Sequence, residues 1–419
     1  MLESRPREKT EIRRHQRKHA RRKKTDDTGE ERGGNGDVGH AAFVPPPIAK
    51  RNTSARGSLR SDCRVIALAF LRPARQSASF VIEQAIPMAK LRNLITDVPG
   101  VKVGHATDMK IGSGVTAIVF DEPAIAAVDQ RGGGPGTREV SLLELAATVQ
   151  HVDAIAISGG SAFGLESAAG VMAYLAEQGR GYAVRSARVP IVPGAILFDL
   201  LNGADKGWGR YPPYRELGHA AAAATAHEFA LGSVGAGTGA LTENLKGGIG
   251  SASALSPTGH IVGAIAAANA AGRVTAGDGP HFWSAPFEVE NEFGGLGFPE
   301  KLAHEALTPH LKGGPLQNTT LAVIATDAEL TKPQAARLGL IASAGLARAI
   351  WPVYTPLDGD IVFSAATGRK PVSDPRRDLA ALGATAAACL ARAVARGVYE
   401  AAALPYRGSC AAWRDRFGK

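Results

Sequence analysis

The stretch that decides the fold of this chain is Pro315-Leu316-Gln317-Asn318-Thr319-Thr320-Leu321-Ala322-Val323-Ile324-Ala325-Thr326-Asp327. It places a polar Asn-Thr pair directly before a short apolar run of the kind that forms a buried strand. If the bond between Asn318 and Thr319 broke, Thr319 would become a chain terminus at the mouth of a sheet. Its hydroxyl could then act as a nucleophile and its α-amine, with a pKa of about 8, as the base. An ordinary loop-to-strand junction explains the same spacing, so both interpretations stay open.

A second polar stretch has the same relation to an apolar run. Thr355-Pro356-Leu357-Asp358-Gly359-Asp360 comes just before Ile361-Val362-Phe363. Carboxylates at positions i and i+2 of an extended segment point to the same side and repel, which raises a pKa or requires a cation between them. An ammonium group on Thr319 would be such a cation. The alternative is a surface turn, because Asp and Gly favour turns.

The rest of the chain alternates short apolar runs with helical patterns. The runs predict strands over 114–120, 124–129, 154–158 and 321–326. Apolar residues at helical spacing predict helices over 139–152, 162–178, 216–231, 332–350 and 378–396. Strands mixed with long helices predict an α/β or α+β layered domain, and the part from Met88 onward has a suitable length for one large domain.

The net positive charge of the chain comes from its first fifth. The 419 residues carry a net charge of +9, and residues 1–87 hold 19 Lys+Arg against 10 Asp+Glu, whereas the remainder is balanced. The balanced part gives no reason to expect nucleic acid. The composition of residues 1–87 predicts a disordered basic leader. Because the segment from Met88 resembles a natural start of a chain, the leader is also interpreted as an extension added by an upstream start codon. No signal peptide or membrane span is evident, which makes the cytoplasm the expected location.

Other familiar sites are not met. Cys63, Cys389 and Cys410 are too few and too scattered for a disulfide framework or a zinc site. The Gly-rich turns lack the Lys-Ser/Thr of a phosphate loop, and Ser161 lacks the second glycine of a nucleophile elbow. These observations predict neither a nucleotide cofactor nor a metal.

Taken together, the motifs resemble those of a known family. The matching segments, in order, are Asn93-Leu94-Ile95-Thr96-Asp97-Val98-Pro99-Gly100-Val101-Lys102-Val103-Gly104-His105, Ser158-Gly159-Gly160-Ser161-Ala162-Phe163-Gly164-Leu165, Gly235-Ala236-Gly237-Thr238-Gly239, Leu245-Lys246-Gly247-Gly248-Ile249-Gly250-Ser251-Ala252-Ser253, Asn318-Thr319-Thr320, Ala325-Thr326-Asp327-Ala328 and Thr355-Pro356-Leu357-Asp358-Gly359-Asp360. Over residues 93–402 the chain resembles the self-cleaving L-aminopeptidase/D-esterase (DmpA-like) family. That family also contains β-aminopeptidases and nylon-oligomer endohydrolases.

The resemblance implies a four-layer αββα sandwich, similar in layout to N-terminal-nucleophile hydrolases but differently connected. It implies a precursor cut at Asn318–Thr319 into subunits 88–318 and 319–419 that stay together. The processed heterodimers are expected to assemble into a homotetramer or larger. No cofactor or metal is implied.

The resemblance also implies roles for single residues. Thr319 is the expected nucleophile, Asp358 and Asp360 hold its α-ammonium and hydroxyl, and Asn269 stabilises the oxyanion. Lys246 matches a basic residue that assists processing or catalysis. The aminopeptidase members tend to use Ser with a Ser-x-Glu pair, so Thr319 with two aspartates resembles the nylon-oligomer branch.

These expectations describe an amidase that acts on small peptides, aminoacyl amides or 6-aminohexanoate-type oligomers through an acyl-Thr319 intermediate. Two alternatives remain at this point. A related fold serves glutamate N-acetyltransferases (ornithine acetyltransferases), which also cut before a Thr and pass an acetyl group to an amine. The other alternative is a non-enzymatic binding protein, which would show no cleavage.

Overall fold

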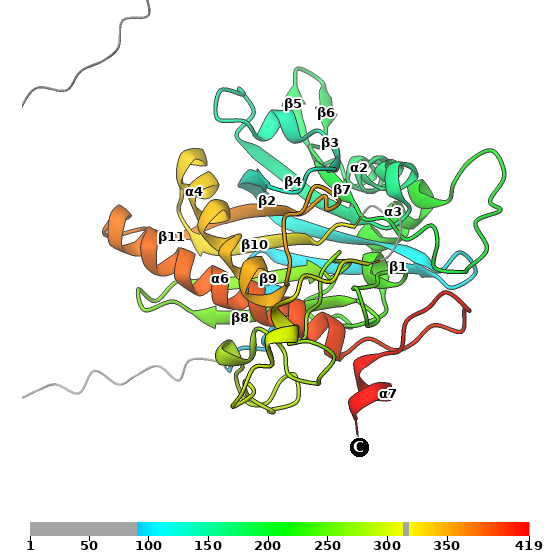
Figure 1. Ribbon diagram of the computed structural model, residues 1–419. Helices are drawn as coiled ribbons and strands as arrows, with labels where there is room; N and C mark the ends of the chain where they lie inside the picture. Colours follow the sequence, from blue (N-terminus) through cyan, green and yellow to red (C-terminus); the bar gives the residue numbers. More distant parts are fainter. Residues whose placement is uncertain (1–89, 313–317, 419) are drawn as a thin grey trace, which may run out of the picture. The chain divides into compact units, whose positions relative to one another are not determined.

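The computed structural model describes residues 90–312 and 318–418 (Figure 1). The predicted leader 1–87, the proposed start at Met88 and Cys63 lie outside these residues. Residues 313–317, just before the Asn318–Thr319 bond, lie outside them too.

A nine-stranded mixed sheet runs through the described part of the chain, in the order β3-β7-β4-β2-β11-β10-β9-β8, with β1 paired to β2. Its strands are β1 (Val101–Asp108), β2 (Ser113–Gln130), β3 (Gly136–Arg138), β4 (His151–Ser158), β7 (Gly194–Ile196), β8 (Ile249–Leu255), β9 (Ile261–Ala267), β10 (Leu321–Ala328) and β11 (Ile361–Lys370). A separate hairpin consists of β5 (Tyr182–Val184) and β6 (Ala187–Val189). The first half of β2 pairs with β1 and β4, and its last residues pair with β11. One long strand therefore replaces the two predicted over 114–120 and 124–129.

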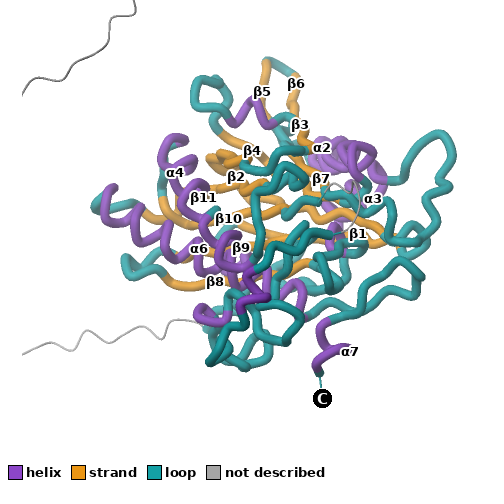
Figure 2. The backbone as a smooth tube through the Cα atoms, in the orientation of Figure 1, coloured by secondary structure: helices purple, strands orange, loops and turns teal. Residues whose placement is uncertain are grey.

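Alternating side chains along the strands divide the sheet into two layers. Ile118 of β2 and Val323 of β10 enter the same central core, so the two halves of the sheet face each other. The neighbouring Ala117 and Ile324 point the opposite way, into two separate outer cores. Because successive strand residues face opposite sides, each half of the sheet has one inner and one outer face. Helices cover both outer faces, which confirms the expected αββα sandwich (Figure 2).

The helices fall into two groups. Those over the β1–β2–β4 half are α2 (Ser167–Glu177) and α3 (Tyr214–Ala223). Those over the β8–β11 half are α4 (Lys332–Ala342), α5 (Ala344–Ala349) and α6 (Pro375–Tyr399), and a short α7 (Trp413–Phe417) follows. The long α6 begins after Asp374, whose side chain accepts hydrogen bonds from the backbone N–H of Arg376 and Arg377. Gly250 lets β8 approach α6 closely, since a Cβ there would lie 1.9 Å from the Ala393 carbonyl oxygen.

Helix α6 is long and apolar enough to cross a membrane by length and composition. In the structure 67% of its most apolar window is buried, where it lies across the β8–β11 half of the sheet (Figure 1). Its apolar character is therefore explained by its place in the core.

Two of the predicted helices are wrong in part or in full. The helix predicted over 139–152 is absent: residues 140–143 form one 3-10 turn, and β4 already begins at His151. The carbonyl oxygens of Leu142 and Val149 accept hydrogen bonds from Lys332 Nζ, at 2.9 Å each, instead of from N–H groups of a helix. Leu145, at helical spacing, is 58% exposed. The helix predicted over 216–231 ends at Ala223, whereas those over 332–350 and 378–396 are confirmed, the first as α4 and α5 with a break at Ser343.

Candidate active site

Strand register brings the predicted site residues together at one end of β10. Leu321 at the start of β10 pairs with Ile361 of the parallel β11 and with Ala267 of the antiparallel β9. Asp360 directly precedes β11 and Asn269 lies two residues beyond the end of β9. Both therefore lie beside Thr319 and Thr320, which precede β10. Each of these polar side chains follows or precedes a buried strand, so the sheet itself fixes their positions.

The Asn318–Thr319 bond is held at both ends. Thr319 N–H donates to the Asn269 carbonyl oxygen at 2.9 Å, and the Thr319 hydroxyl donates to the Asn318 carbonyl oxygen at 2.6 Å. The same oxygen accepts a 2.6 Å hydrogen bond from Gly359 N–H. Asn318, Thr319 and Thr320 are all buried. The carbonyl before the predicted nucleophile is thus polarised by a backbone donor.

Gly359 allows this close approach because it has no side chain. A Cβ at this position would lie 2.6 Å from Thr319 Oγ1 and 2.7 Å from the Gly134 carbonyl oxygen. Gly134 N–H in turn donates to the Asp358 carbonyl oxygen at 2.8 Å. The glycine-rich segment after β2 therefore packs directly on the Asp358–Asp360 segment.

Asp358 is buried and its carboxylate is held by three donors. Oδ1 accepts from Ala271 N–H at 3.1 Å, and Oδ2 accepts from the hydroxyl and the N–H of Thr355 at 2.7 and 3.2 Å. These bonds tie the segment before β11 to the segment after β9. Asp358 therefore connects the two segments that flank Thr319.

Asp360 is also buried, and its surroundings disfavour the ionised form of its carboxyl group. Thr320 N–H donates to Oδ1 at 2.7 Å and Tyr354 N–H donates to Oδ2 at 3.1 Å. Burial, and then repulsion from Asp358, raise the pKa of Asp360 to about 7. This repulsion is what the i, i+2 spacing predicts. A cation placed beside the two carboxylates would relieve it.

Asn269 is buried at the same end of the sheet. Its Oδ1 accepts from Leu241 N–H at 2.9 Å and from Lys312 Nζ at 3.3 Å, and its Nδ2 donates to the Phe198 carbonyl oxygen at 3.2 Å. Its backbone carbonyl is the acceptor of Thr319 N–H. Asn269 thus contacts the predicted nucleophile through its backbone and faces Phe198 with its amide.

Lys246 is fully buried and binds a loop. Its ammonium donates to the carbonyl oxygens of Gly237, Ala240 and Gly247 at 3.1, 2.9 and 2.6 Å. Burial lowers its pKa to about 7, against the attraction of Asp199. Among its hydrogen bonds in the described part of the chain, none reaches Thr319 or the two aspartates. The structure therefore places Lys246 in the support of the 237–247 loop.

A pocket of about 270 Å³ opens at Thr319. None of its lining side chains is charged; they are Gly134, Pro135, Gly136, Ser161, Ala162, Ile196, Phe198 and Thr319. A larger hollow of about 870 Å³ shares Ala162 with it and is lined by both acidic and basic side chains, Glu166, Arg210, Arg215 and Glu216, together with Phe163, Tyr211, Pro212 and Pro213. The predicted nucleophile is therefore accessible from a neutral pocket next to a charged one.

Three residues at this site were missed by reasoning from the sequence. Lys312 belongs to none of the motifs considered there, Gly359 is considered only as part of a possible surface turn, and Ser161 only as a rejected nucleophile elbow. Ser161 has a positive φ of 52° and lines the pocket. A non-glycine residue in that conformation signals a constrained turn, but nothing in the sequence reveals it. In residues 90–312 and 318–418, no group of three or more His, Cys, Asp or Glu side chains could hold a metal ion.

Comparison with known proteins shows which family the chain belongs to. Residues 93–410 match the model of peptidase family S58. An uncharacterized aminopeptidase of Mycobacterium tuberculosis is 43% identical over 331 residues, which cover 74% of this chain and 94% of that protein. A 6-aminohexanoate-oligomer endohydrolase of a Kocuria species is 28% identical over 286 residues, covering 65% and 74% of the two chains.

Solved structures have the same fold. A β-aminopeptidase of a Burkholderia species matches with a TM-score of 0.56 and 24% identity, over 77% of this chain and 90% of that one. The L-aminopeptidase D-Ala-esterase/amidase of Ochrobactrum anthropi, described as a variant of the Ntn hydrolase fold, matches with a TM-score of 0.57 and 20% identity, over 78% and 94%. At these identities the likeness concerns the fold. The family match and the relatives carry the identification: this chain belongs to peptidase family S58, the DmpA-like family, and is a hydrolase of amide bonds.

Proposed function

We propose that this chain cuts itself between Asn318 and Thr319 and then hydrolyses amide bonds with Thr319 as its amino-terminal nucleophile. The observation that carries the proposal is the geometry around one carbonyl. The Asn318 oxygen lies 2.6 Å from the Thr319 hydroxyl oxygen and 2.6 Å from Gly359 N. A carbonyl oxygen held by a backbone donor is prepared for the negative charge that develops on attack.

Self-cleavage would transfer the acyl group of Asn318 from nitrogen to oxygen. Thr319 Oγ1 bonds to the Asn318 carbonyl carbon and gives up its proton, the bond from that carbon to Thr319 N breaks, and the nitrogen takes the proton. The result is an ester between Asn318 and Thr319 Oγ1 and a free α-amine on Thr319. Water then hydrolyses the ester, leaving a carboxylic acid on Asn318 and restoring the hydroxyl.

The freed α-amine would serve as the base during turnover. It takes the Thr319 hydroxyl proton as the oxygen attacks a substrate carbonyl, and it returns that proton to the leaving amine. As an ammonium it would place a further positive charge beside Asp358 and Asp360, which make no ion pair with another described residue. An oxyanion donor such as Asn269 Nδ2 contributes roughly 3–4 kcal/mol to such a reaction.

The neutral pocket at Thr319 supports a substrate whose acyl part is uncharged next to the scissile bond. The relatives are named as an aminopeptidase and as a 6-aminohexanoate-oligomer endohydrolase. The inner amides of a peptide or an oligoamide lie in an uncharged chain, whereas the first amide of a peptide lies one carbon away from the terminal ammonium. The larger charged hollow beyond Ala162 offers room for such an end.

The two products of self-cleavage would remain together. β10, at the start of the second fragment, lies between β9 of the first fragment and β11, and β11 pairs with β2 of the first fragment. Separating the fragments would break the sheet through its middle. The active form is therefore a heterodimer of the two fragments.

Replacing Thr319 tests the proposal. We expect Thr319→Ala to give one uncut chain on a denaturing gel and by intact mass, with no hydrolysis of alanine p-nitroanilide or of a linear 6-aminohexanoate trimer. Thr319→Ser keeps a hydroxyl and should still cut, which separates loss of the nucleophile from loss of packing. Cleavage of Thr319→Ala between residues 318 and 319 into the two fragments would exclude the mechanism.

A further inference from the structure

The orientation of the Asn269 side chain determines whether it can act on a substrate. A carboxamide has an acceptor end and a donor end of almost the same shape, and its surroundings decide which end points where. Here Oδ1 receives two donors, Leu241 N–H at 2.9 Å and Lys312 Nζ at 3.3 Å. A flipped amide would point its own N–H groups at both of these donors. The two donors therefore direct Nδ2 toward Phe198, a residue that lines the pocket at Thr319.

Of the two donors, Lys312 is the one supplied by a side chain, and it is itself firmly placed. Its Nζ also donates to the Leu241 carbonyl oxygen at 3.0 Å, and its backbone N–H donates to the Ala271 carbonyl oxygen at 3.0 Å. Burial lowers the pKa of Lys312 to about 8, whereas Cys410, Asp358 and Asp199 act in the opposite direction. A lysine brought into so dry a place needs its hydrogen bonds.

These contacts lead from Lys312 to two segments beside the nucleophile. Lys312 holds Asn269 by its side chain and Ala271 by its backbone. Ala271 N–H donates to Asp358 Oδ1, and the Asn269 carbonyl oxygen accepts from Thr319 N–H. A change at Lys312 therefore reaches both the Asn269 amide and, through the Asn269 carbonyl, the segment that carries the nucleophile.

We propose that Lys312 is a positioning residue that holds the Asn269 amide with Nδ2 toward the Thr319 pocket. Among the described residues the second N–H of Nδ2 has no acceptor, so it can donate to the oxygen of a substrate carbonyl. The inference rests on the proposed function, because it gives Asn269 an oxyanion to stabilise. It adds a residue that lies seven positions before the proposed nucleophile and stays on the first fragment after cleavage.

Methionine and arginine at position 312 separate positioning from packing. Lys312→Met keeps the length and loses both donors to Asn269 and Leu241, whereas Lys312→Arg keeps them. We expect kcat for alanine p-nitroanilide or the 6-aminohexanoate trimer to fall by tenfold or more in Lys312→Met, with KM changed by less than about threefold, because a lost oxyanion donor acts on the transition state. Lys312→Arg should recover most of kcat.

Lys332→Met is the matched control. Lys332 is a buried lysine whose Nζ binds two carbonyl oxygens, of Leu142 and Val149, away from Thr319. It should lower the melting temperature and leave kcat within about twofold, since it removes packing and hydrogen bonds alone. The melting temperature of every variant is measured beside its kinetics.

The outcomes distinguish the two proposals. Unchanged kcat in Lys312→Met, or equal losses in Lys312→Met and Lys312→Arg that follow their melting temperatures, would overturn the role of Lys312 while Thr319→Ala stays uncut and inactive. If Lys312→Met does not fold, Lys312→Arg decides the role of Lys312. A kcat of Lys312→Arg at or below a hundredth of the wild-type value would overturn that role, and a near-normal kcat would support it. Cleavage or turnover by Thr319→Ala would instead refute the proposed function itself.

Discussion

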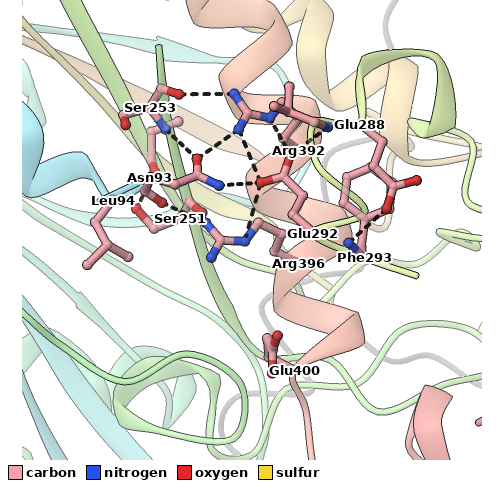
Figure 3. Close-up of polar contacts among 12 residues, drawn as sticks. Asn93, Leu94, Ser251, Ser253, Glu288, Glu292, Phe293, Arg392, Arg396 and Glu400 are labelled. Carbon is pink, nitrogen blue, oxygen red and sulfur yellow. Dashed lines mark hydrogen bonds and ion pairs between the residues drawn. The ribbon is translucent and has the colours of Figure 1, made fainter. Parts of the chain in front are cut away.

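Two of the buried charge clusters in the described part of the molecule differ in how their carboxylates are paired. In the Glu292 cluster, Glu292 is paired with Arg392 at 2.5 Å and with Arg396 at 3.5 Å, all three at low exposure (Figure 3). At the active site, Asp358 and Asp360 lie two residues apart and, within residues 90–312 and 318–418, neither has an ion pair. The Glu292 carboxylate is thus paired with two guanidinium groups. The hydrogen bonds to the two aspartates come instead from N–H and hydroxyl donors of the described residues.

The difference separates a structural site from a chemical one. Figure 3 shows Arg392 and Arg396 projecting from α6 toward Glu292, with Asn93 between them. Arg392 also donates to Asn93 Oδ1 and Arg396 to the Asn93 carbonyl oxygen, so the cluster fastens the start of the described chain to the last long helix. The aspartates instead retain unfavourable charge, which is typical of functional sites. Under the proposed function, the free α-amine of Thr319 would bring a cation beside them.

Removing the Glu292 carboxylate, which both arginines share, should have the largest effect on the free energy of unfolding. Glu292→Ala leaves two arginines buried without their carboxylate, which typically costs about 3–5 kcal/mol. We expect the free energy of unfolding, measured by urea denaturation, to fall by about that amount. Hydrolytic activity per folded molecule should be unchanged, because the cluster does not contact Thr319.

An exposed ion pair gives the control for this prediction. Glu228 pairs with Arg92 at 2.8 Å, with side chains 72% and 47% exposed. Glu228→Ala should change the free energy of unfolding by less than about 1 kcal/mol. Equal losses in the two variants would mean that burial does not distinguish the Glu292 cluster.

A methyl group at Gly359 should disturb the unbalanced cluster by a smaller amount. In Gly359→Ala the new Cβ would lie 2.6 Å from Thr319 Oγ1, so the nucleophile or the Gly134 segment must shift. Overpacking of this kind costs about 1–3 kcal/mol. If the displacement falls on the attacking oxygen, self-cleavage slows by about tenfold or more, since about 1.4 kcal/mol corresponds to a factor of ten.

The rate of conversion of freshly purified precursor into fragments, followed on a gel, measures this effect. Gly279→Ala is the control, because the nearest atom to a Cβ there is 3.7 Å away. Normal processing in Gly359→Ala would show that the hydroxyl is not confined by the backbone at position 359.

Local sequence patterns predicted the part of the site that borders strands. Thr319 and Asp360 each lie one or two residues before a short apolar run, and such runs enter buried strands whatever else surrounds them. Once β10 and β11 pair in parallel, their adjacent polar residues must meet. The four-layer fold itself came from the resemblance to a family, because the alternation of apolar residues does not reveal which strands face each other.

The missed parts depend on contacts between distant segments. The helix predicted over 139–152 fails because Lys332, about 190 residues away, takes the carbonyl oxygens that a helix would use. Lys312 has the same character: its partners Leu241 and Asn269 are separated from it by 71 and 43 residues. No local pattern around Lys312 shows that it meets them.

The last effect concerns the proton on Asp360, and it is best measured in the uncut Thr319→Ala chain. The pKa of Asp360 is raised from 3.8 to about 7, so between these values the folded chain keeps a proton that the unfolded chain has released. Stability that depends on this proton is present at low pH and is lost as the pH rises toward 7. Asp360→Asn cannot lose it. The free energy of unfolding of Thr319→Ala/Asp360→Asn should therefore rise relative to Thr319→Ala as the pH increases from about 4 to 7. We expect a rise of at least about 1.4 kcal/mol, the equivalent of one pKa unit. Groups that titrate in both proteins cancel in this difference. A difference that stays flat across the range would mean that Asp360 is ionised throughout, and that the two carboxylates already have a countercharge before Thr319 acquires its free amine.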